Sequence, residues 1–292
     1  MQARLIEVGQ VTDASPCAVI LTALPLEYEA VRAHLTGLEV LVHSSGARLE
    51  RGALPGTPWL VALTEIGEGA YDAASSTERV ISAWLQPQAL LFVGVAGSLK
   101  KDVRLGDIVI ATKVYAYHGG KETPEGFYAR PQAWVVSHRL EQAARFALRG
   151  QPGVHFKPIA AGDVVLNAAG PALADQLNRR YNDAVAVEKE GTGVAHAAHL
   201  TGALDILTIR GISDTADGDK DSTDPQRSLS RAAARAAEAA IAVLRELEPH
   251  VRPSDAGPSA SDPGYGGDYI DFRGSTFYGP VTGKVVRNHQ DD

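Results

Sequence analysis

Cysteine is nearly absent from the sequence, since Cys17 is the only one among 292 residues. A single cysteine excludes an internal disulfide, and a chain without disulfides suits a reducing compartment. Cys17 has no activating neighbour in the sequence. His118, His196 and His199 lack carboxylates nearby at the spacing of metal ligands, which favours surface or core roles for them. We therefore expect neither a metal nor a redox cofactor.

Long apolar runs are also missing. No stretch approaches the ~20 apolar residues that a membrane-spanning helix needs. The first residues, MQARLIEVGQVTDASP, place charges among apolar positions, unlike a signal peptide. We expect a soluble cytoplasmic protein without a membrane partner. The net charge of -7 at pH 7 argues against nucleic acid as a partner, because binding a phosphate backbone needs a basic surface.

Apolar runs rich in Val and Ile alternate with helical patterns along most of the chain. The composition predicts buried strands at residues 18–23, 59–64, 89–97, 107–117, 154–162, 184–188 and 205–212. Helical periodicity covers residues 25–35, 70–85, 131–148, 171–181, 191–200 and about 228–248. This alternation is typical of βαβ units whose sheet is covered on both faces, so the sequence predicts an α/β sandwich.

The composition changes after Pro249. Residues 249–266 are rich in Pro, Ser, Gly and Asp, and they contain too few apolar residues to offset the entropy of ordering. Residues 267–292 concentrate aromatic and β-branched residues between glycines, which suits strand pairing. We therefore expect an N-terminal extension (1–16), a catalytic domain (17–248), a flexible linker (249–266) and a separate C-terminal segment (267–292).

Asp214 follows the predicted strand 205–212 after one serine. Ligands of open α/β sheets bind at the carboxyl ends of strands. A strand end would hold Asp214 rigidly at the rim of the sheet and partly desolvate it. Partial burial raises the pKa of a carboxyl group, which suits a general acid. Alternatively, Asp214 caps the next segment or bonds a neighbouring turn.

Further carboxylates follow other strand ends. Glu188 and Glu190 form an E-x-E pair where strand 184–188 meets helix 191–200. Glu190 could accept ribose hydroxyls and stabilise positive charge on a sugar ring, or it could simply favour the helix N-terminus. Glu27 comes just after Pro25, which is placed to open a helix. Glu27 could deprotonate a water molecule, or it could be a solvated residue of the first turn.

Two glycine-containing segments could approach a ligand through their backbone. Gly94, Ala96 and Gly97 follow a buried strand, and Gly67 and Gly69 precede a predicted helix. Short glycine runs of this kind are equally compatible with tight turns.

In their order and spacing, these segments resemble the purine nucleoside phosphorylase and nucleosidase superfamily, from about Ala18 to Leu247. The resemblance implies a three-layer α/β/α sandwich with a central mixed sheet. It implies that Glu190 holds the ribose hydroxyls, that Asp214 interacts with purine N7, and that Glu27 activates water.

The resemblance also implies a substrate-binding set. It contains the glycine-rich strand end, the base-side loop AGDVVLN, the VEKE motif and the RGISD motif: Val95, Ala96, Gly97, Val165, Leu166, Glu188, Lys189, Arg210 and Ser213.

The first motif favours hydrolysis. Phosphorylases of this type usually offer a Gly and Arg phosphate cradle where this chain has ALPLEYEA, and a carboxylate there repels phosphate. One position departs from the methylthioadenosine-type nucleosidases, which usually carry Met where Lys189 stands. Lys189 could meet a 5′ phosphate, joined by Arg210 or by Lys100 and Lys101, or it could extend to solvent.

The stretch DVRLGDIVIATKVYAYHGGKE, residues 102–122, also resembles the nucleosidase modules of NLR-like immune receptors and anti-phage systems, some of which cleave adenine nucleotides, including ATP. The segment GSTFYGPVTGKVV is similar to short amyloid signalling motifs that recruit identical or homologous segments, although Pro280 interrupts it and a disordered tail is the alternative.

Three hypotheses follow. The first is an N-ribosyl hydrolase of adenine nucleotides or nucleosides that acts as an immune effector, in a homo-oligomer and with an NLR-like receptor as partner. The second is a housekeeping methylthioadenosine or adenosine nucleosidase, or a phosphorylase. The third is a non-catalytic nucleotide-sensing assembly module.

Overall fold

The computed structural model describes residues 3–5, 15–42, 48–67, 69, 73–76, 87–124, 126–162, 171–200, 205–215 and 225–250. All of them belong to one unit, Met1–His250. The predicted linker and C-terminal segment, the base-side residues Val165 and Leu166, and most of the predicted helix 70–85 lie outside these ranges.

A central mixed sheet runs through the unit in the order β1-β3-β4-β5-β2-β6-β12-β11-β7-β10, with β13 paired to both β6 and β7. Its strands are β1 (Ala3–Leu5), β2 (Cys17–Thr22), β3 (Thr36–Val42), β4 (Arg48–Ala53), β5 (Leu60–Glu65), β6 (Ala89–Ser98), β7 (Ile108–Ala116), β10 (Gln132–Val135), β11 (Val154–Ala161), β12 (Ala186–Glu188) and β13 (Ile206–Thr215). A separate hairpin joins β8 (Gly120–Thr123) to β9 (Gly126–Ala129).

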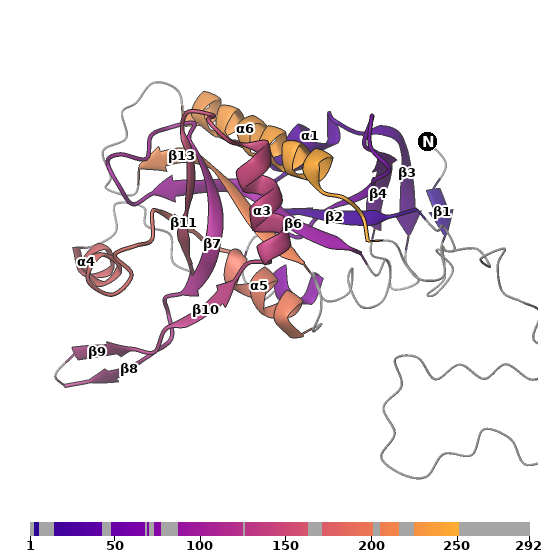
Figure 1. The fold of residues 1–292 in the computed structure, drawn as a ribbon. Helices are drawn as coiled ribbons and strands as arrows, with labels where there is room; N and C mark the ends of the chain where they lie inside the picture. Colours follow the sequence, from indigo (N-terminus) through magenta and orange to yellow (C-terminus); the bar gives the residue numbers. More distant parts are fainter. Residues whose placement is uncertain are drawn as a thin grey trace, which may run out of the picture. The chain divides into compact units, whose positions relative to one another are not determined.

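Helices cover both faces of the sheet (Figure 1). The helices α1 (Pro25–Arg32), α3 (His138–Ala147) and α6 (Pro225–Glu246) lie on one face, and α5 (Gly191–Leu200) lies on the other. Successive side chains of β2 and β6 point to opposite faces of the sheet and pack in two different parts of the core. Ile20 and Leu91 pack with the core that contains α6, whereas Leu21 and Phe92 pack with Val194 of α5. The predicted α/β sandwich with a central mixed sheet is therefore confirmed.

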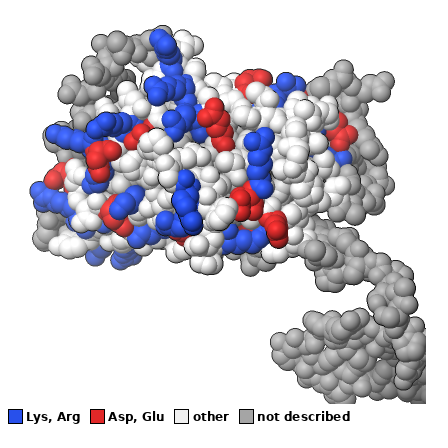
Figure 2. Space-filling view, turned by 45° about the horizontal axis from the view of Figure 1, so that its top comes forward, with Lys and Arg blue, Asp and Glu red and all other residues white. Residues whose placement is uncertain are grey.

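The long helix α6 lies very close to the sheet. Its buried side is mostly alanine, and a Cβ atom added to Gly211 of β13 would lie 2.0 Å from the carbonyl oxygen of Ala232. Small side chains on both elements permit this approach. Figure 2 brings the face covered by α6 forward and shows Lys and Arg interspersed with Asp and Glu. No helix among the described residues is long and apolar enough to span a membrane.

The predicted helix 131–148 is wrong in its first part. Residues Gln132–Val135 form β10, which pairs antiparallel with β7, and α3 begins only at His138. The Ser137 hydroxyl accepts a hydrogen bond from the Leu140 amide at 3.3 Å and caps α3. Aromatic and β-branched residues before this cap favour strand pairing at the sheet edge.

Several short strands were absent from the sequence prediction: β1, β3, β4, β8 and β9. The segment of β3 and β4 carries charged residues and glycine, so its apolar pattern is weak. Their pairing with neighbouring strands, rather than local composition, makes them strands.

Parallel strands bring the predicted site segments to one edge. β2 and β13 both run parallel to β6, so their carboxyl ends meet at the same side of the sheet. The strand β12 runs antiparallel to β6, with Val187 opposite Gly97. This reversal brings the VEKE motif back along β6, toward the end of β2 and the level of Gly94, which pairs with Arg210 of β13.

Candidate active site

The carboxyl end of β6 is the centre of the candidate site. Glu27 bonds the backbone of Val95, Arg210 lies beside Gly94, and Asp214 lies against Gly97. Three segments far apart in the sequence thus bring functional groups to one strand end, as predicted.

Glu27 is held rigidly although it lies in the first turn of α1. Its Oε2 accepts hydrogen bonds from the amides of Ala23 (2.9 Å) and Leu24 (3.0 Å), and its Oε1 accepts one from Val95 (2.8 Å). A carboxylate can accept about four hydrogen bonds, so one position stays free of these amides. Burial raises the pKa of Glu27, while Arg210 and the three amides oppose this shift. The result is a buried carboxylate suited to act as a base.

Arg210 is a buried cation between two carboxylates. Its Nη2 donates to Glu188 at 2.9 Å, and its guanidinium stacks 3.8 Å from the ring centroid of Phe92. A Cβ atom at Gly94 would come within 2.6 Å of the Glu27 carboxylate and 3.0 Å of Arg210. The side chain of Arg210 is only 2% exposed. The prediction that Arg210 joins a phosphate site is therefore wrong for this conformation, because its guanidinium is enclosed by protein.

Glu188 is held at the junction of β12 and α5 by three hydrogen-bond donors. Its carboxylate accepts hydrogen bonds from Arg210 and from the amides of Glu190 and Gly191. A Cβ atom at Gly191 would lie 2.3 Å from Glu188 Oε1, so glycine is required there. These contacts make Glu188 the anchor of the strand-to-helix junction, and its predicted contact with substrate stays a prediction.

Glu190 lies at the N-terminus of α5, where its carbonyl accepts from the amide of Gly193. Its Oε1 accepts a hydrogen bond from the amide of Gly69 at 3.2 Å, and among the described residues its Oε2 has no hydrogen-bond partner. Burial and then the Glu188 charge raise the pKa of Glu190, while Arg210, Gly69 and Lys189 oppose this. One oxygen is thus available to accept hydroxyl groups.

Asp214 lies inside β13, near its end, rather than after the strand. Its side chain is exposed, so the expected partial burial is wrong for this structure. A Cβ atom at Gly97 would lie 2.7 Å from Asp214 Oδ1, and the Ser213 hydroxyl donates to Asp214 Oδ2 at 3.1 Å. The carboxyl group is accessible at the rim while its backbone is held in the sheet.

The other predicted residues have less defined roles. Val95 and Gly97 are half-buried on β6, and Ala96 is buried with its carbonyl near the Ser213 hydroxyl. Lys189 is half-buried, and its charge lowers the pKa of Glu190. Within the described ranges, no cluster of three or more His, Cys, Asp and Glu could hold a metal ion.

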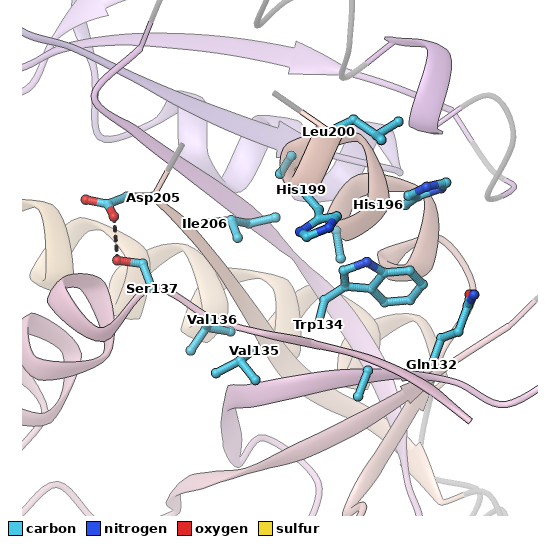
Figure 3. A pocket seen from close by; sticks show the side chains of 13 residues that line it. Gln132, Trp134, Val135, Val136, Ser137, His196, His199, Leu200, Asp205 and Ile206 are labelled. Atoms are coloured by element: carbon cyan, nitrogen blue, oxygen red, sulfur yellow. Dashed lines mark hydrogen bonds between the residues drawn. The ribbon is translucent and has the colours of Figure 1, made fainter. Parts of the chain in front are cut away.

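A cavity of about 1050 Å³ is lined by none of the site residues described above and lies among β10, α5 and the start of β13 (Figure 3). Trp134, His196 and His199 line it, and the Ser137 hydroxyl bonds Asp205 at its edge. None of the candidate catalytic residues lines this cavity. We therefore assign the site from the converging carboxylates and not from the size of the cavity.

Comparison with known proteins gives one family and several relatives. The sequence pattern of the phosphorylase superfamily matches residues 18–247, so the chain belongs to this superfamily. A 5′-methylthioadenosine/S-adenosylhomocysteine nucleosidase of Chromohalobacter salexigens is 28% identical over 235 residues, which cover 78% of this chain and 96% of that protein. An enzyme of the same name from Actinobacillus succinogenes is 30% identical over 194 residues, covering 64% of this chain and 82% of that protein.

Solved structures agree with the fold. The S. pneumoniae nucleosidase of that name, solved with the transition-state inhibitor MT-ImmA, is 27% identical with a TM-score of 0.69, covering 80% of this chain and all of that one. The Streptococcus pyogenes S-adenosylhomocysteine nucleosidase, at 22% identity and a TM-score of 0.71, covers 81% of this chain and 99% of that one, and supports the fold alone.

Replacing Arg210 with Met should strongly destabilise the protein. The variant keeps the length of the side chain but leaves the buried Glu188 carboxylate without its cation, which costs about 3–5 kcal/mol. Urea unfolding of both proteins measures this difference. Arg179→Met is the control, because Arg179 forms an exposed pair with Asp175 and should change stability by less than about 0.5 kcal/mol. Equal stability of the two variants would contradict the buried pair.

Replacing Glu190 with Gln should stabilise the protein at neutral pH. A carboxyl group whose folded-state pKa is raised contributes stability below its unfolded pKa, and this contribution is lost as pH rises through the folded pKa. Glutamine does not ionise, so the melting temperature of the variant should exceed that of the wild type more at pH 7.5 than at pH 4.5. Glu238→Gln, on the exposed side of α6, is the control. A variant that melts below the wild type at pH 7.5 refutes the expectation.

Proposed function

We propose that this chain, which belongs to the phosphorylase superfamily, hydrolyses the N-glycosidic bond of adenine nucleosides. The observation that carries the proposal is the buried Glu27 carboxylate, which accepts hydrogen bonds from three backbone amides of the described residues. The relatives named above are nucleosidases, and we extend their reaction type to this chain. They favour a general methylthioadenosine or adenosine nucleosidase over the defence effector of our first hypothesis.

In the proposed reaction, Glu27 takes a proton from water as the water oxygen attacks the anomeric carbon. Burial supports this role because it raises the pKa of Glu27 and makes the carboxylate a better base. The bond between the sugar and the base breaks, and the base leaves with a proton supplied by Asp214. The products are adenine and a free sugar, and solvent returns both carboxyl groups to their starting states.

Glu190 would stabilise the sugar while this bond breaks. Its Oε2, which has no hydrogen-bond partner among the described residues, can accept hydrogen bonds from ribose hydroxyls, and its negative charge favours positive charge on the ring in the transition state. Water is preferred over phosphate as the nucleophile because phosphate would approach the Glu27 carboxylate against charge repulsion.

Lys189 supports adenine nucleotides as a second class of substrate. Lys189 is half-buried and adjacent in sequence to Glu190, the proposed ribose ligand, so an anionic group on the sugar would find a cation nearby. Arg210 is a less favourable phosphate ligand because its guanidinium is enclosed. The role in immunity, assembly as a homo-oligomer and recruitment through residues 267–292 stay predictions, and those C-terminal residues lie outside the described ranges.

Replacing Asp214 with Asn should lower adenine release by about 10²–10⁴-fold, because the leaving base loses its proton donor. Chromatography of adenine released from methylthioadenosine and adenosine, with and without phosphate, measures the effect. Release by the wild type should not depend on phosphate. Asp175→Asn, exposed on α4 (Pro171–Arg180), should keep full activity. An active Asp214→Asn variant refutes the role of Asp214, and a wild type that releases no adenine refutes the proposed function.

Replacing Lys189 with Met should change the choice of substrate. Removing the cation should lower kcat/KM for AMP or ATP by about tenfold relative to methylthioadenosine, the loss expected for one charged contact. Steady-state kinetics on the three substrates measures the ratio. Lys157→Met, exposed on β11 and outside the candidate site, is the control. An unchanged ratio for Lys189→Met would show that Lys189 does not select phosphorylated substrates.

A further inference from the structure

We infer, on the basis of the hydrolase function proposed above, that Ser228 of α6 is a positioning residue that sets the location of the Asp214 carboxyl group. Ser228 does not touch Asp214. It acts on the backbone of the preceding residue, Ser213, whose carbonyl oxygen accepts a hydrogen bond from the Ser228 hydroxyl at 2.7 Å.

A bulge in β13 makes this contact important. Ile212 pairs with Ala96, but the next pair along the strands joins Asp214 to Gly97, so Ser213 is an extra residue on β13. A bulge of this kind re-aims the side chain that follows it and leaves its extra residue outside the regular ladder. The Ser213 carbonyl therefore needs a partner from elsewhere, and α6 supplies it.

Other contacts hold the bulge from its other side. The Ile212 amide donates to the carbonyl of Asp107 at 2.9 Å, and the Ile212 carbonyl accepts from the amide of Gly106 at 2.8 Å. The turn at residues 105–106 thus fixes the residue before the bulge. Ser228 fixes the bulged residue itself.

The helix that carries Ser228 has little freedom to shift. The carbonyl of Ala232, one turn further along α6, would lie 2.0 Å from a Cβ atom at Gly211, so backbone packs directly on backbone there. The Ser228 hydroxyl is therefore presented from a rigid support.

Asp214 has little space on the opposite side. Its Oδ1 lies 2.7 Å from where a Cβ atom of Gly97 would be, and its Oδ2 is bonded by the Ser213 hydroxyl. A small shift of the bulge would therefore move the carboxyl group relative to β6. Misplacement of a catalytic group by about 1 Å can cost about 10²-fold in rate.

The test compares Ser228→Ala with Ser230→Ala. The Ser230 hydroxyl bonds the carbonyl of Gln226 within the same helix and is exposed, so its loss controls for general effects on α6. We expect Ser228→Ala to lower kcat for methylthioadenosine roughly tenfold with KM within about twofold. Ser230→Ala should leave both unchanged, and Ser228→Thr, which keeps the hydroxyl, should restore kcat.

A double variant distinguishes an effect of Ser228 on the position of Asp214 from an effect that does not depend on Asp214. If Ser228 acts through Asp214, adding Ser228→Ala to Asp214→Asn should lower kcat by less than about twofold further. A full further tenfold loss would overturn the inference, as would wild-type kcat in Ser228→Ala. If the wild type releases no adenine, the proposed function fails. Calorimetric titration of adenine then tests the inference alone, with weaker binding expected for Ser228→Ala and equal binding refuting it.

Discussion

The buried guanidinium of Arg210 is the interaction on which the candidate site depends. It pairs with Glu188, stacks on Phe92 and opposes the rise that burial causes in the pKa of Glu27 and Glu190. Without this cation, three carboxylates near the end of β6 would repel one another in a poorly solvated place. With it, the group still carries more negative than positive charge. That imbalance suits a reaction whose transition state places positive charge on a sugar ring.

Glycine makes this concentration of charge sterically possible. A Cβ atom at Gly94, Gly97 or Gly191 would lie within 3 Å of the oxygen of Glu27, Asp214 or Glu188, respectively. Each carboxylate therefore occupies the space of an absent side chain and lies directly against the backbone. The arrangement brings backbone amides within hydrogen-bonding distance of Glu27 and Glu188.

The sequence could predict elements whose apolar pattern is strong, and residues at their ends. Glu27, Glu190 and Asp214 were found because each follows a clear strand or opens a helix. Patterns do not show side-chain direction or partners, so Arg210 and Glu188 were assigned to the substrate although they bond each other. β10 was missed because pairing with β7 decides its conformation. No sequence pattern marks Ser228 as a site residue, because its partner is the carbonyl of a bulged residue, and the bulge is visible only in the pairing of β6 with β13.

The choice between water and phosphate as nucleophile follows from how Glu27 is held. Burial raises the pKa of this carboxyl group, and Arg210 and three backbone amides oppose that rise. Two of these amides, those of Ala23 and Leu24, lie at the start of α1, and helix N-termini often bind anions. Because Glu27 accepts from both amides, a phosphate would find these donors occupied, which agrees with water as the proposed nucleophile.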